Sequence, residues 1–444
     1  MYDPMRVRRK PHVPVAFYYL LGKRYDDAIR KTDNIVAYKA TTHYNVFTLY
    51  FVGTGENKVY LIALKMLMGD RGKYLGLIMG LTFAALLITQ QSSIFTGLMT
   101  RTYSFINDLS QPDIWVMDPK VQFIDDIKPL QDTELFRVRG VSGVEWAVPL
   151  YKGLLKARLE DGNFQIVNVL GLDDATLIGG PPQMIEGNLS DLRRQDAIIV
   201  NDVGAATRLA KRPKEAGGKP TPLQVGDVLE INDRRAVVVG ISRVSRTFQS
   251  QPVVYTTYSR ATNFAPRERK LLSFVLVKTA DGVNPTELAR KISKNTGLAA
   301  YTAQEFKDLT YNFYMKSTGI PINFGIAVML GFLIGTAIAG QTFYNFTLEN
   351  LRYFGTLKAM GTTNGVLLRM ILLQALVVGV LGFGLGVGGA ALFGYLMRGS
   401  ELAFRLVPEI LLLAGGAITL IIVLSALISI RKVMKLEPAI VFKA

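Results

Sequence analysis

The residue types that most enzymes use for chemistry are scarce in this sequence of 444 residues. It contains no cysteine, and its two histidines, His12 and His43, both lie near the N-terminus. Beyond Met66, therefore, no imidazole or thiolate is available as a general base, a nucleophile or a metal ligand. We predict no metal site and no directly bound cofactor.

Two pairs of carboxylates and one glycine-rich stretch are the remaining candidates for chemistry. Asp125–Asp126 and Asp173–Asp174 are neighbours in sequence, and neighbouring side chains rarely converge on one substrate, so we favour solvated surface over an acid–base pair. The stretch Gly217–Lys219 resembles the end of a phosphate-binding loop, but Pro220 stands where Ser or Thr is required. We predict no catalytic site, so any ATP that drives this protein would be hydrolysed by another polypeptide.

Four long stretches without charge dominate the hydropathy pattern of a chain that is 49% hydrophobic. They run from Tyr74 to Met99, from Ser317 to Leu348, from Met370 to Met397 and from Ile410 to Ile430. Each exceeds the roughly 20 residues that a helix needs to cross a bilayer. We predict four transmembrane helices, and the first is too long to be the apolar part of a cleaved signal peptide.

The basic residues predict the orientation of these helices. They cluster before the first stretch, between the second and third, and after the fourth: Lys65, Arg71, Lys73; Arg352, Lys358, Arg369; Arg431, Lys432, Lys435 and Lys443. By the positive-inside rule both termini are cytoplasmic and residues 100–316 lie outside. The net charge of +16 lies mostly beside apolar stretches, which favours anionic lipid over nucleic acid as a partner.

Small residues in the second and third apolar stretches predict close helix packing. Gly331 and Gly335 stand four residues apart in the second stretch, as do Gly382 and Gly386 in the third. We favour packing over a hinge or the lining of a path. Because no charged residue lies deep in any stretch, a proton relay, a voltage sensor or an ion-coupled carrier is disfavoured.

Between the first two spans the pattern changes to short strand-like runs, which predicts a mixed α+β domain. The runs are Asp113–Met117, Val144–Leu150, Phe164–Leu170, Ala197–Val200, Val228–Ile231, Ala236–Ile241 and Leu272–Val277. Helices are predicted over Asp202–Lys211 and Pro285–Asn295, and a hairpin turn at Asn232–Asp233. The stretch Lys211–Pro222, rich in Pro, Gly and Lys, is predicted to be an exposed loop and a candidate boundary between two lobes.

The link between the second and third spans, residues 349–369, carries an apolar stripe. Leu351, Phe354, Leu357 and Met360 recur at three-residue spacing, so a helix would place them on one face. The charged residues beside them are Glu349, Arg352 and Lys358. Such a stripe can lie on a membrane surface or dock into a groove of a soluble partner, and periodicity alone favours neither.

Several strings in the chain resemble those of a known superfamily. The link "ENLRYFGTLKAMGTTNGVLLRMILLQAL", the two spans after it and the terminal "RKVMKLEPAIVFKA" are similar to the C-terminal half of the FtsX/MacB permeases, membrane subunits of ABC systems. The strings "KMLMGDRGKYLGLIMG", "QPDIWVMDP" and "VRGVSGVEWAVPLYKG" resemble the DevC branch, which works with a DevA ATPase and a DevB membrane-fusion protein. The resemblance covers residues 62–444.

This resemblance implies a homodimer in the inner membrane, with one ATPase beneath each subunit and a MacB-like periplasmic domain that meets an adaptor leading to an outer-membrane tunnel protein. ATP would be used by the ATPase alone. The segment matching residues 349–361 would be the coupling helix, contacting the ATPase through Glu349, Leu351, Arg352, Phe354, Leu357, Lys358 and Met360. The implied function is tripartite export of a glycolipid, a lipid-like molecule or a small amphiphile. The alternatives are an FtsX-like mechanotransmitter that activates a cell-wall hydrolase, and LolC/LolE-like lipoprotein release.

The predicted organisation follows from these segments. It comprises an N-terminal extension (1–61), an amphipathic segment with the first helix (62–99), the α+β domain (100–316), the second helix (317–348), the coupling segment (349–369), the third and fourth helices (370–397 and 407–430) and a cytoplasmic tail (431–444). The extension has no counterpart in the superfamily. It is either a cytoplasmic addition or the product of a start codon assigned upstream of the true one, and we favour the second.

Overall fold

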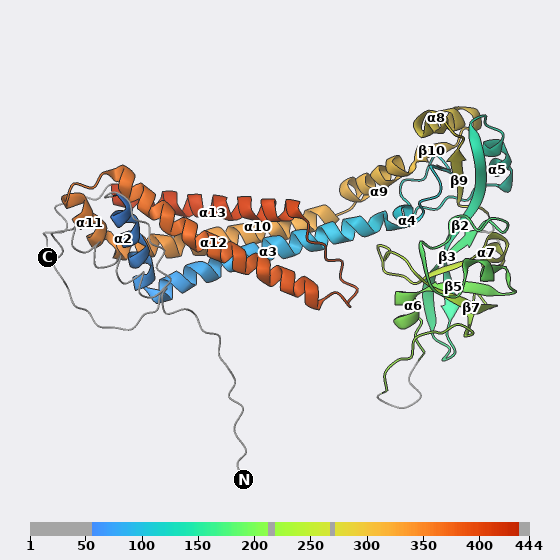
Figure 1. Ribbon diagram of the computed structural model, residues 1–444, viewed down its shortest axis with the longest axis horizontal. Coiled ribbons are helices and arrows are strands. Elements are labelled where there is room, and N and C mark those ends of the chain that lie inside the picture. The colour runs from blue at the N-terminus through green and yellow to red at the C-terminus, as the bar shows by residue number, and fades with distance from the viewer. Residues whose placement is uncertain (1–55, 212–217, 267–270, 435–444) are drawn as a thin grey trace, which may run out of the picture. The chain divides into compact units, whose positions relative to one another are not determined.

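The computed structural model describes residues 56–211, 218–266 and 271–434 (Figure 1). The predicted N-terminal extension lies almost wholly outside the described residues, as does the tail beyond residue 434. Within the described part, a bundle of long helices is joined to a domain of strands and shorter helices, here called the inter-span domain (residues 103–319).

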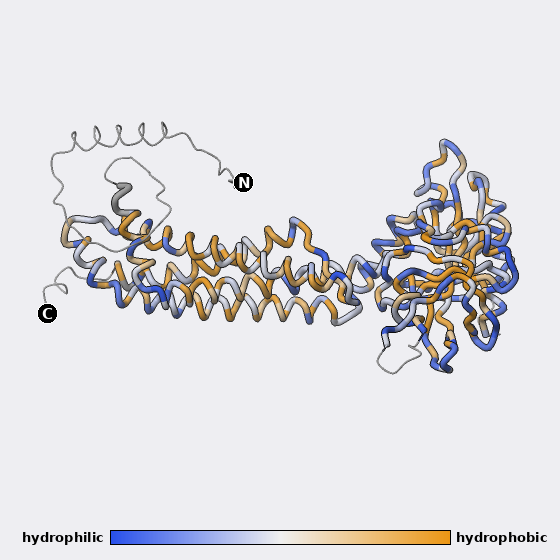
Figure 2. Tube along the Cα trace, turned by 60° about the horizontal axis from the view of Figure 1, so that its bottom comes forward, coloured by the Kyte–Doolittle hydropathy of each residue, from blue (hydrophilic) through white to orange (hydrophobic). Residues whose placement is uncertain are grey.

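Among the described residues, four helices are long and apolar enough to cross a membrane: α3 (Arg71–Thr102), α10 (Ile320–Glu349), α12 (Asn364–Leu396) and α13 (Pro408–Met434). Figure 2 shows apolar residues along these helices, whereas hydrophilic residues cover much of the inter-span domain. At 1.5 Å per residue a helix of 32 residues is about 48 Å long, which exceeds a hydrocarbon core of about 30 Å. The predicted four spans, with an α+β domain between the first two, are confirmed.

The bounds of the helices differ from those of the uncharged stretches that revealed them. The third span begins at Asn364, inside the range predicted for the coupling segment, and therefore includes Arg369. The second begins at Ile320, because Ser317 ends the preceding helix α9 (Ala303–Ser317). A search for uncharged residues finds only the part of a helix that lies in hydrocarbon, since a helix continues readily through a terminal arginine.

Helix α3 packs against each of the other three long helices. All four glycines singled out in the sequence lie against it. A Cβ at Gly331 would stand 3.2 Å from Leu87 Cβ, at Gly382 2.6 Å from Leu81 Cβ and at Gly386 2.5 Å from Ala85 Cβ; at Gly335 it would collide with Ala84. A residue larger than glycine at Gly335, Gly382 or Gly386 would push the helices apart. The absence of side chains at these positions therefore sets how closely α10 and α12 can pack against α3.

The first lobe of the inter-span domain is a four-stranded antiparallel sheet in the order β10-β1-β9-β2. Its elements are β1 (Ile114–Met117), α5 (Asp132–Arg139), the first half of β2 (Val144–Arg158), β9 (Phe274–Thr279), α8 (Pro285–Thr296) and β10 (Ala299–Thr302). This sequence of elements is the ferredoxin-like split βαβ arrangement. The two helices cover one face of the sheet, and α4 (Ser104–Asp108) and α9 contribute to the core on the other.

The second lobe is inserted between β2 and β9 and is a small closed barrel. Its strands are the second half of β2, β3 (Phe164–Leu172), β8 (Val253–Thr257), β5 (Ala197–Asn201), β7 (Arg234–Arg243) and β6 (Val228–Ile231). Each pairs with the next, and β6 pairs with β2, which closes the ring; β4 (Gln183–Glu186) adds to β7. Alternate residues such as Leu155, Val167 and Ile198 fill the interior, and closure leaves no long open edge. The short helices η1 (Leu189–Arg193), α6 (Asp202–Ala206) and α7 (Tyr258–Phe264) lie on the connections between strands.

Each of the seven predicted strand runs falls on a strand, and the hairpin turn is confirmed. Asn232 and Asp233 both adopt positive φ, 45° and 61°, between the paired strands β6 and β7, as a type I′ turn requires. The predicted helix Asp202–Lys211 was too long, because α6 ends at Ala206. The sequence prediction missed β4, β8 and β10, of which β4 and β10 are only four residues long.

The boundary between the lobes was placed wrongly. It falls within β2, whose residues 144–150 pair with β9 and whose residues 151–158 pair with β3. The loop around Lys211–Pro222, of which residues 212–217 are not described, lies within the barrel lobe and is closed by a bridge between Lys211 and Thr221. A continuous strand shared by two sheets leaves no break in composition, so the sequence pattern did not reveal it.

The packing around α3 predicts unequal effects for two neighbouring glycines. Gly386→Leu should destabilise the bundle by about 1–3 kcal/mol, because the new side chain collides with α3. Gly388→Leu is the matched control, since a Cβ there meets no atom within 4 Å. Thermal aggregation of the detergent-solubilised full chain measures both. Equal aggregation temperatures for the two variants would contradict the proposed packing of α12 on α3.

Candidate functional site

Helix α11 (Leu351–Ala359) occupies the predicted coupling segment and packs on the bundle through its apolar stripe. Phe354 is fully buried, in the same apolar cluster as Leu67 of α2 (Glu56–Gly69) and Met370 of α12, and Leu351 and Leu357 pack against that cluster. Of the four stripe residues, Leu351, Phe354 and Leu357 are therefore occupied by contacts within the chain, whereas Met360 is exposed. A partner could reach Met360 and the face of α11 that points away from the bundle.

The exposed face of α11 carries both charge and apolar surface. Tyr353 is 62% exposed and Met360, which follows the helix, is 70% exposed. Arg352 is also exposed, whereas Lys358 is half-buried and its ammonium donates to the Met434 carbonyl of α13 over 3.2 Å. Of the seven residues predicted to contact an ATPase, Arg352 and Met360 on or next to α11 are thus presented outward, and Phe354 is not.

Lys73 joins the start of α3 to the end of α10, beside α11. Its ammonium pairs with Asp70, which precedes α3, at 2.7 Å, and with Glu349, the last residue of α10. The Asp70 carboxylate also accepts from the Lys73 backbone N–H over 3.2 Å. These hydrogen bonds from Lys73 hold the pKa of Asp70 below its usual value. The start of α3 and the end of α10 are therefore tied together beside α11.

The paired carboxylates considered as catalytic candidates do not form a joint site. Asp125 pairs with the buried Lys152, and Asp126 pairs with Lys128 at 2.7 Å. Asp173 and Asp174 likewise accept hydrogen bonds from separate partners: Asp173 from Thr176 N over 2.9 Å and Asp174 from Ser259 Oγ over 2.8 Å. Each carboxylate thus stabilises a local turn or contact. The stretch Gly217–Lys219 falls partly outside the described residues.

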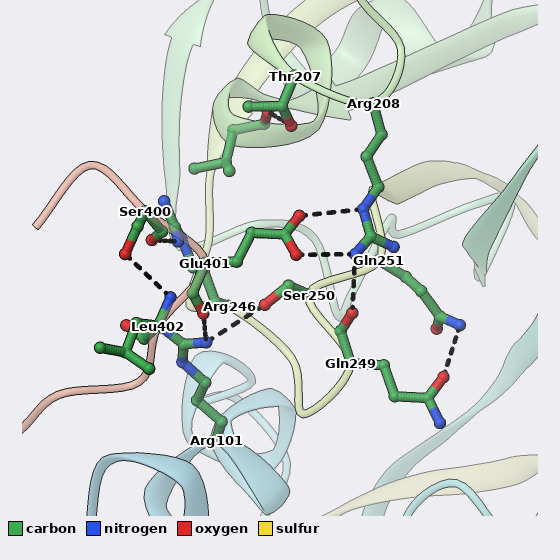
Figure 3. Close-up of polar contacts among 11 residues, drawn as sticks. Arg101, Thr207, Arg208, Arg246, Gln249, Ser250, Gln251, Ser400, Glu401 and Leu402 are labelled. Carbon is green, nitrogen blue, oxygen red and sulfur yellow. Dashed lines mark hydrogen bonds and ion pairs between the residues drawn. The ribbon is translucent and has the colours of Figure 1, made fainter. Parts of the chain in front are cut away.

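A second cluster, which sequence reasoning did not identify, lies where the bundle adjoins the inter-span domain (Figure 3). The link between α12 and α13, residues 397–407, meets the barrel lobe there. Arg208, just after α6, makes a bidentate ion pair with Glu401 of the link, with Nε to Oε1 and Nη2 to Oε2 both at 3.1 Å. Bidentate arginine–carboxylate pairs fix orientation as well as distance.

Two further arginines bind main-chain oxygens of the same link (Figure 3). Arg101, near the end of α3, donates to the carbonyls of Glu401 at 2.6 Å and Leu402 at 3.1 Å. Arg246, in the β7–β8 connection, donates to the Ser400 carbonyl. The link is therefore held at once by α3, by the β7–β8 connection and by the residue after α6.

The link also passes directly over α3 and α12. A Cβ on Gly97 would stand 2.6 Å from the Ala403 carbonyl oxygen, and Arg405 N donates to Ser93 O over 3.0 Å. Phe404 lies against Gly394, where any side chain would collide with its ring. Nothing in the spacing of Glu401 and Arg405 in the sequence predicts contacts with residues nearly 200 or more positions earlier.

The charges around Glu401 are positive. The hydrogen bonds from Arg208, with added attraction from Arg208, Arg246 and Arg101, lower the pKa of the Glu401 carboxyl. The pair is exposed, so screening by water and salt keeps its energy small. Its importance is geometric, because it connects the link to the barrel lobe.

Two family descriptions match this chain in succession. The FtsX-like permease C-terminal family matches residues 310–438, which contain α10 to α13. The MacB-like periplasmic core domain matches residues 75–295, which contain most of α3 and most of the inter-span domain, without β10 and α9. The chain belongs to the FtsX/MacB superfamily. The resemblance inferred from the sequence is thereby confirmed at that level, while the DevC-like branch stays a prediction.

Individual relatives of this FtsX/MacB chain are distant. An uncharacterized ABC transporter permease of Bacillus subtilis (strain 168), YknZ, is 22% identical over 271 residues, which cover 59% of this chain and 66% of that protein, just under two thirds of its length. The match to the crystal structure of the extracellular domain of YknZ covers 44% of this chain and 99% of the chain in that structure. The two are 15% identical, and the TM-score is 0.29. The periplasmic region of MacB from Actinobacillus actinomycetemcomitans covers 46% and 94% at 15% identity, with a TM-score of 0.32.

The ion pair of Glu401 predicts a pH response of the link. Because its pKa in the folded chain lies below the ordinary 4.5, the pair is complete above that value and is lost as pH falls through the folded-state pKa. Since the chain has no cysteine, spin labels at Gly399→Cys and Pro222→Cys report the distance from the link to the barrel lobe. The distance distribution should broaden on acidification.

Glu401→Gln should show the broadened distribution already at neutral pH, and acid should change it no further. Glu409→Gln, at the start of α13, is the matched control and should keep the wild-type response. A pH response that persists in Glu401→Gln would assign it to another group.

Proposed function

We propose that this chain is the membrane subunit of an ABC transporter of the FtsX/MacB type, in which it passes mechanical change from a separate ATPase to the inter-span domain. Membership of the superfamily supports the permease role. The described residues supply a route for such a relay, which begins at α11 and runs along two long helices.

The observation that carries this proposal is that α3 and α10 meet near α11 and enter one aromatic core at their other ends. The Lys73–Glu349 ion pair joins them near α11. In the inter-span domain, Phe105 of α4, which follows α3, lies 6.0 Å from the Trp115 ring, and Phe306 of α9, which precedes α10, lies 5.6 Å from it. Because packed interiors resist compression, displacement of either helix must move the first lobe.

Packing within the bundle favours a relay over a pore. The glycine contacts bring α10 and α12 against α3, so their interfaces are filled by side chains rather than by a passage. A cargo would then be handled by the inter-span domain and its partners without crossing the bundle. This is the arrangement expected for tripartite export of a glycolipid, a lipid-like molecule or a small amphiphile.

The resemblance supplies the partners in this proposal. They are a DevA-like ATPase, a DevB-like membrane-fusion protein, an outer-membrane tunnel protein and a second copy of this chain, all assembled at the inner membrane with both termini cytoplasmic. The exposed face of α11 is the surface proposed to bind the ATPase. ATP hydrolysis is assigned to that subunit.

The test is loss of ATPase binding from an otherwise intact chain. Tyr353→Asp with Met360→Asp places two charges on the exposed face of α11, and should lower the amount of ATPase that co-purifies from native membranes by roughly tenfold or more. Tyr311→Asp, at a partly exposed tyrosine of α9, is the matched control and should retain the ATPase.

Phe354→Asp behaves differently, because the charge would enter the apolar cluster and lower the yield of folded chain. Unchanged ATPase recovery with the double variant would remove the exposed face of α11 as the binding surface. Recovery of the chain with a cell-wall hydrolase or a lipoprotein carrier, and no membrane-fusion protein, would favour the FtsX-like or LolC/LolE-like alternative.

A further inference from the structure

A cavity of about 580 Å³ lies between the α12–α13 link, the end of α3 and the β7–β8 connection. This volume is within the range of small-molecule sites, about 300–1,000 Å³. Four of the described residues that line it are arginines, and none is acidic: Arg101, Arg246, Arg398 and Arg405. The arginines come from three separate segments, so the fold brings the positive charges together.

Within the described part of the chain, no carboxylate forms an ion pair with any of the four arginines. Arg101 and Arg246 donate to main-chain carbonyls of the link, Arg405 donates to Thr100 Oγ1 over 3.3 Å, and Arg398 stacks over the Tyr395 ring at 5.0 Å. Glu401, the acidic residue of the link, is bound to Arg208.

Asp108, the last residue of α4, accepts from Ser245 Oγ over 2.7 Å. The carboxylates near the cavity are thus bound to other groups. Four guanidinium groups around one cavity repel each other, and an anion bound there would relieve that repulsion while accepting several of their N–H groups.

Part of the remaining wall of the cavity is apolar. Met397, Leu402 and Phe404 line it beside the arginines, together with the polar residues Thr100, Ser104, Asn107, Ser245 and Ser400. It lies at the ends of α3 and α12, two of the helices proposed to span the membrane. Met397, Leu402 and Phe404 would then lie beside the first carbons of an amphiphile whose head group reaches the arginines.

We propose that this cavity binds the anionic head group of a membrane amphiphile, such as a phosphorylated lipid, at the surface of the bilayer next to the inter-span domain. The four arginines bind the acidic oxygens, and Met397, Leu402 and Phe404 contact the first carbons of the tail. The identification of this amphiphile with the exported cargo rests on the proposed function. The binding itself does not.

An anion bound in the cavity would also affect the hydrogen bonds that hold the α12–α13 link. Arg101 and Arg246 are shared between the cavity and the carbonyls that hold residues 400–402. A bound anion competes for the same N–H groups, so ligand and link contacts are coupled. The site thus lies where binding can be sensed by both the bundle and the barrel lobe.

The experiment is native mass spectrometry of the full chain in detergent, without ATPase, titrated with dioctanoyl phosphatidic acid. One molecule should bind saturably. The double variant Arg398→Gln with Arg405→Gln should raise the apparent Kd for this lipid by roughly tenfold or more. These two arginines are chosen because the main contacts that hold the link come from Arg101, Arg208 and Arg246. Arg290→Gln with Lys294→Gln, on the exposed face of α8, removes the same charge elsewhere and should leave the Kd unchanged.

Three results would overturn the proposal: an unchanged Kd in the Arg398–Arg405 variant, equal affinity for zwitterionic dioctanoyl phosphatidylcholine, or inorganic phosphate binding as tightly as the lipid, which would make this a site for free anions. An unchanged thermal aggregation temperature shows that the variant remains folded. Because no ATPase is present, failure here leaves the ATPase co-purification test untouched, and failure of that test leaves this site standing.

Discussion

The structure depends on how closely other helices can approach α3. It contacts the other three long helices of the bundle, and glycines at the contact points allow the backbones to come together: Gly331, Gly335, Gly382 and Gly386. In lipid there is little hydrophobic drive between apolar helices, so shape complementarity has to supply much of the association energy. A bundle assembled in this way is densely packed, and dense packing resists local deformation of its helices.

Helices α3 and α10 are held by contacts within the chain at both of their ends. Near α11, Lys73 connects the start of α3 to Glu349 at the end of α10. At the other end Phe105 and Phe306 approach the same tryptophan, Trp115, from the two chain segments that continue these helices. The first lobe is thus in contact with the segments that continue both helices. The barrel lobe contacts the α12–α13 link through the ion pair between Arg208 and Glu401. Since β2 runs through both lobes, a single continuous strand connects them.

Charged residues are arranged differently at the two ends of the bundle. Acidic and basic groups pair around Lys73, where helix ends must be held together. Beside the inter-span domain arginines outnumber carboxylates, and the α12–α13 link uses its carbonyl oxygens as acceptors. Neutral acceptors hold a guanidinium in place without cancelling its charge. The same side chains can therefore position the link and attract an anion, which a set of closed ion pairs could not do.

The sequence by itself determined the four spans, the α+β domain between the first two and the glycines suited to close packing, because these follow from local composition and periodicity. The superfamily came from the resemblance of several strings to known permeases. It also placed the turn at Asn232 and Asp233, where both residues must adopt a left-handed backbone. Tertiary structure decided which face of α11 is free: three-residue spacing defines a stripe, but only the packed bundle shows that Phe354 is buried and Tyr353 exposed. It likewise decided the barrel closed by β6, the division of the domain within β2 and the meeting of Arg101, Arg208 and Arg246 with a link some 150 to 300 residues later in the chain. Contacts between residues so far apart in sequence depend on how the whole chain folds, and local patterns carry no record of them.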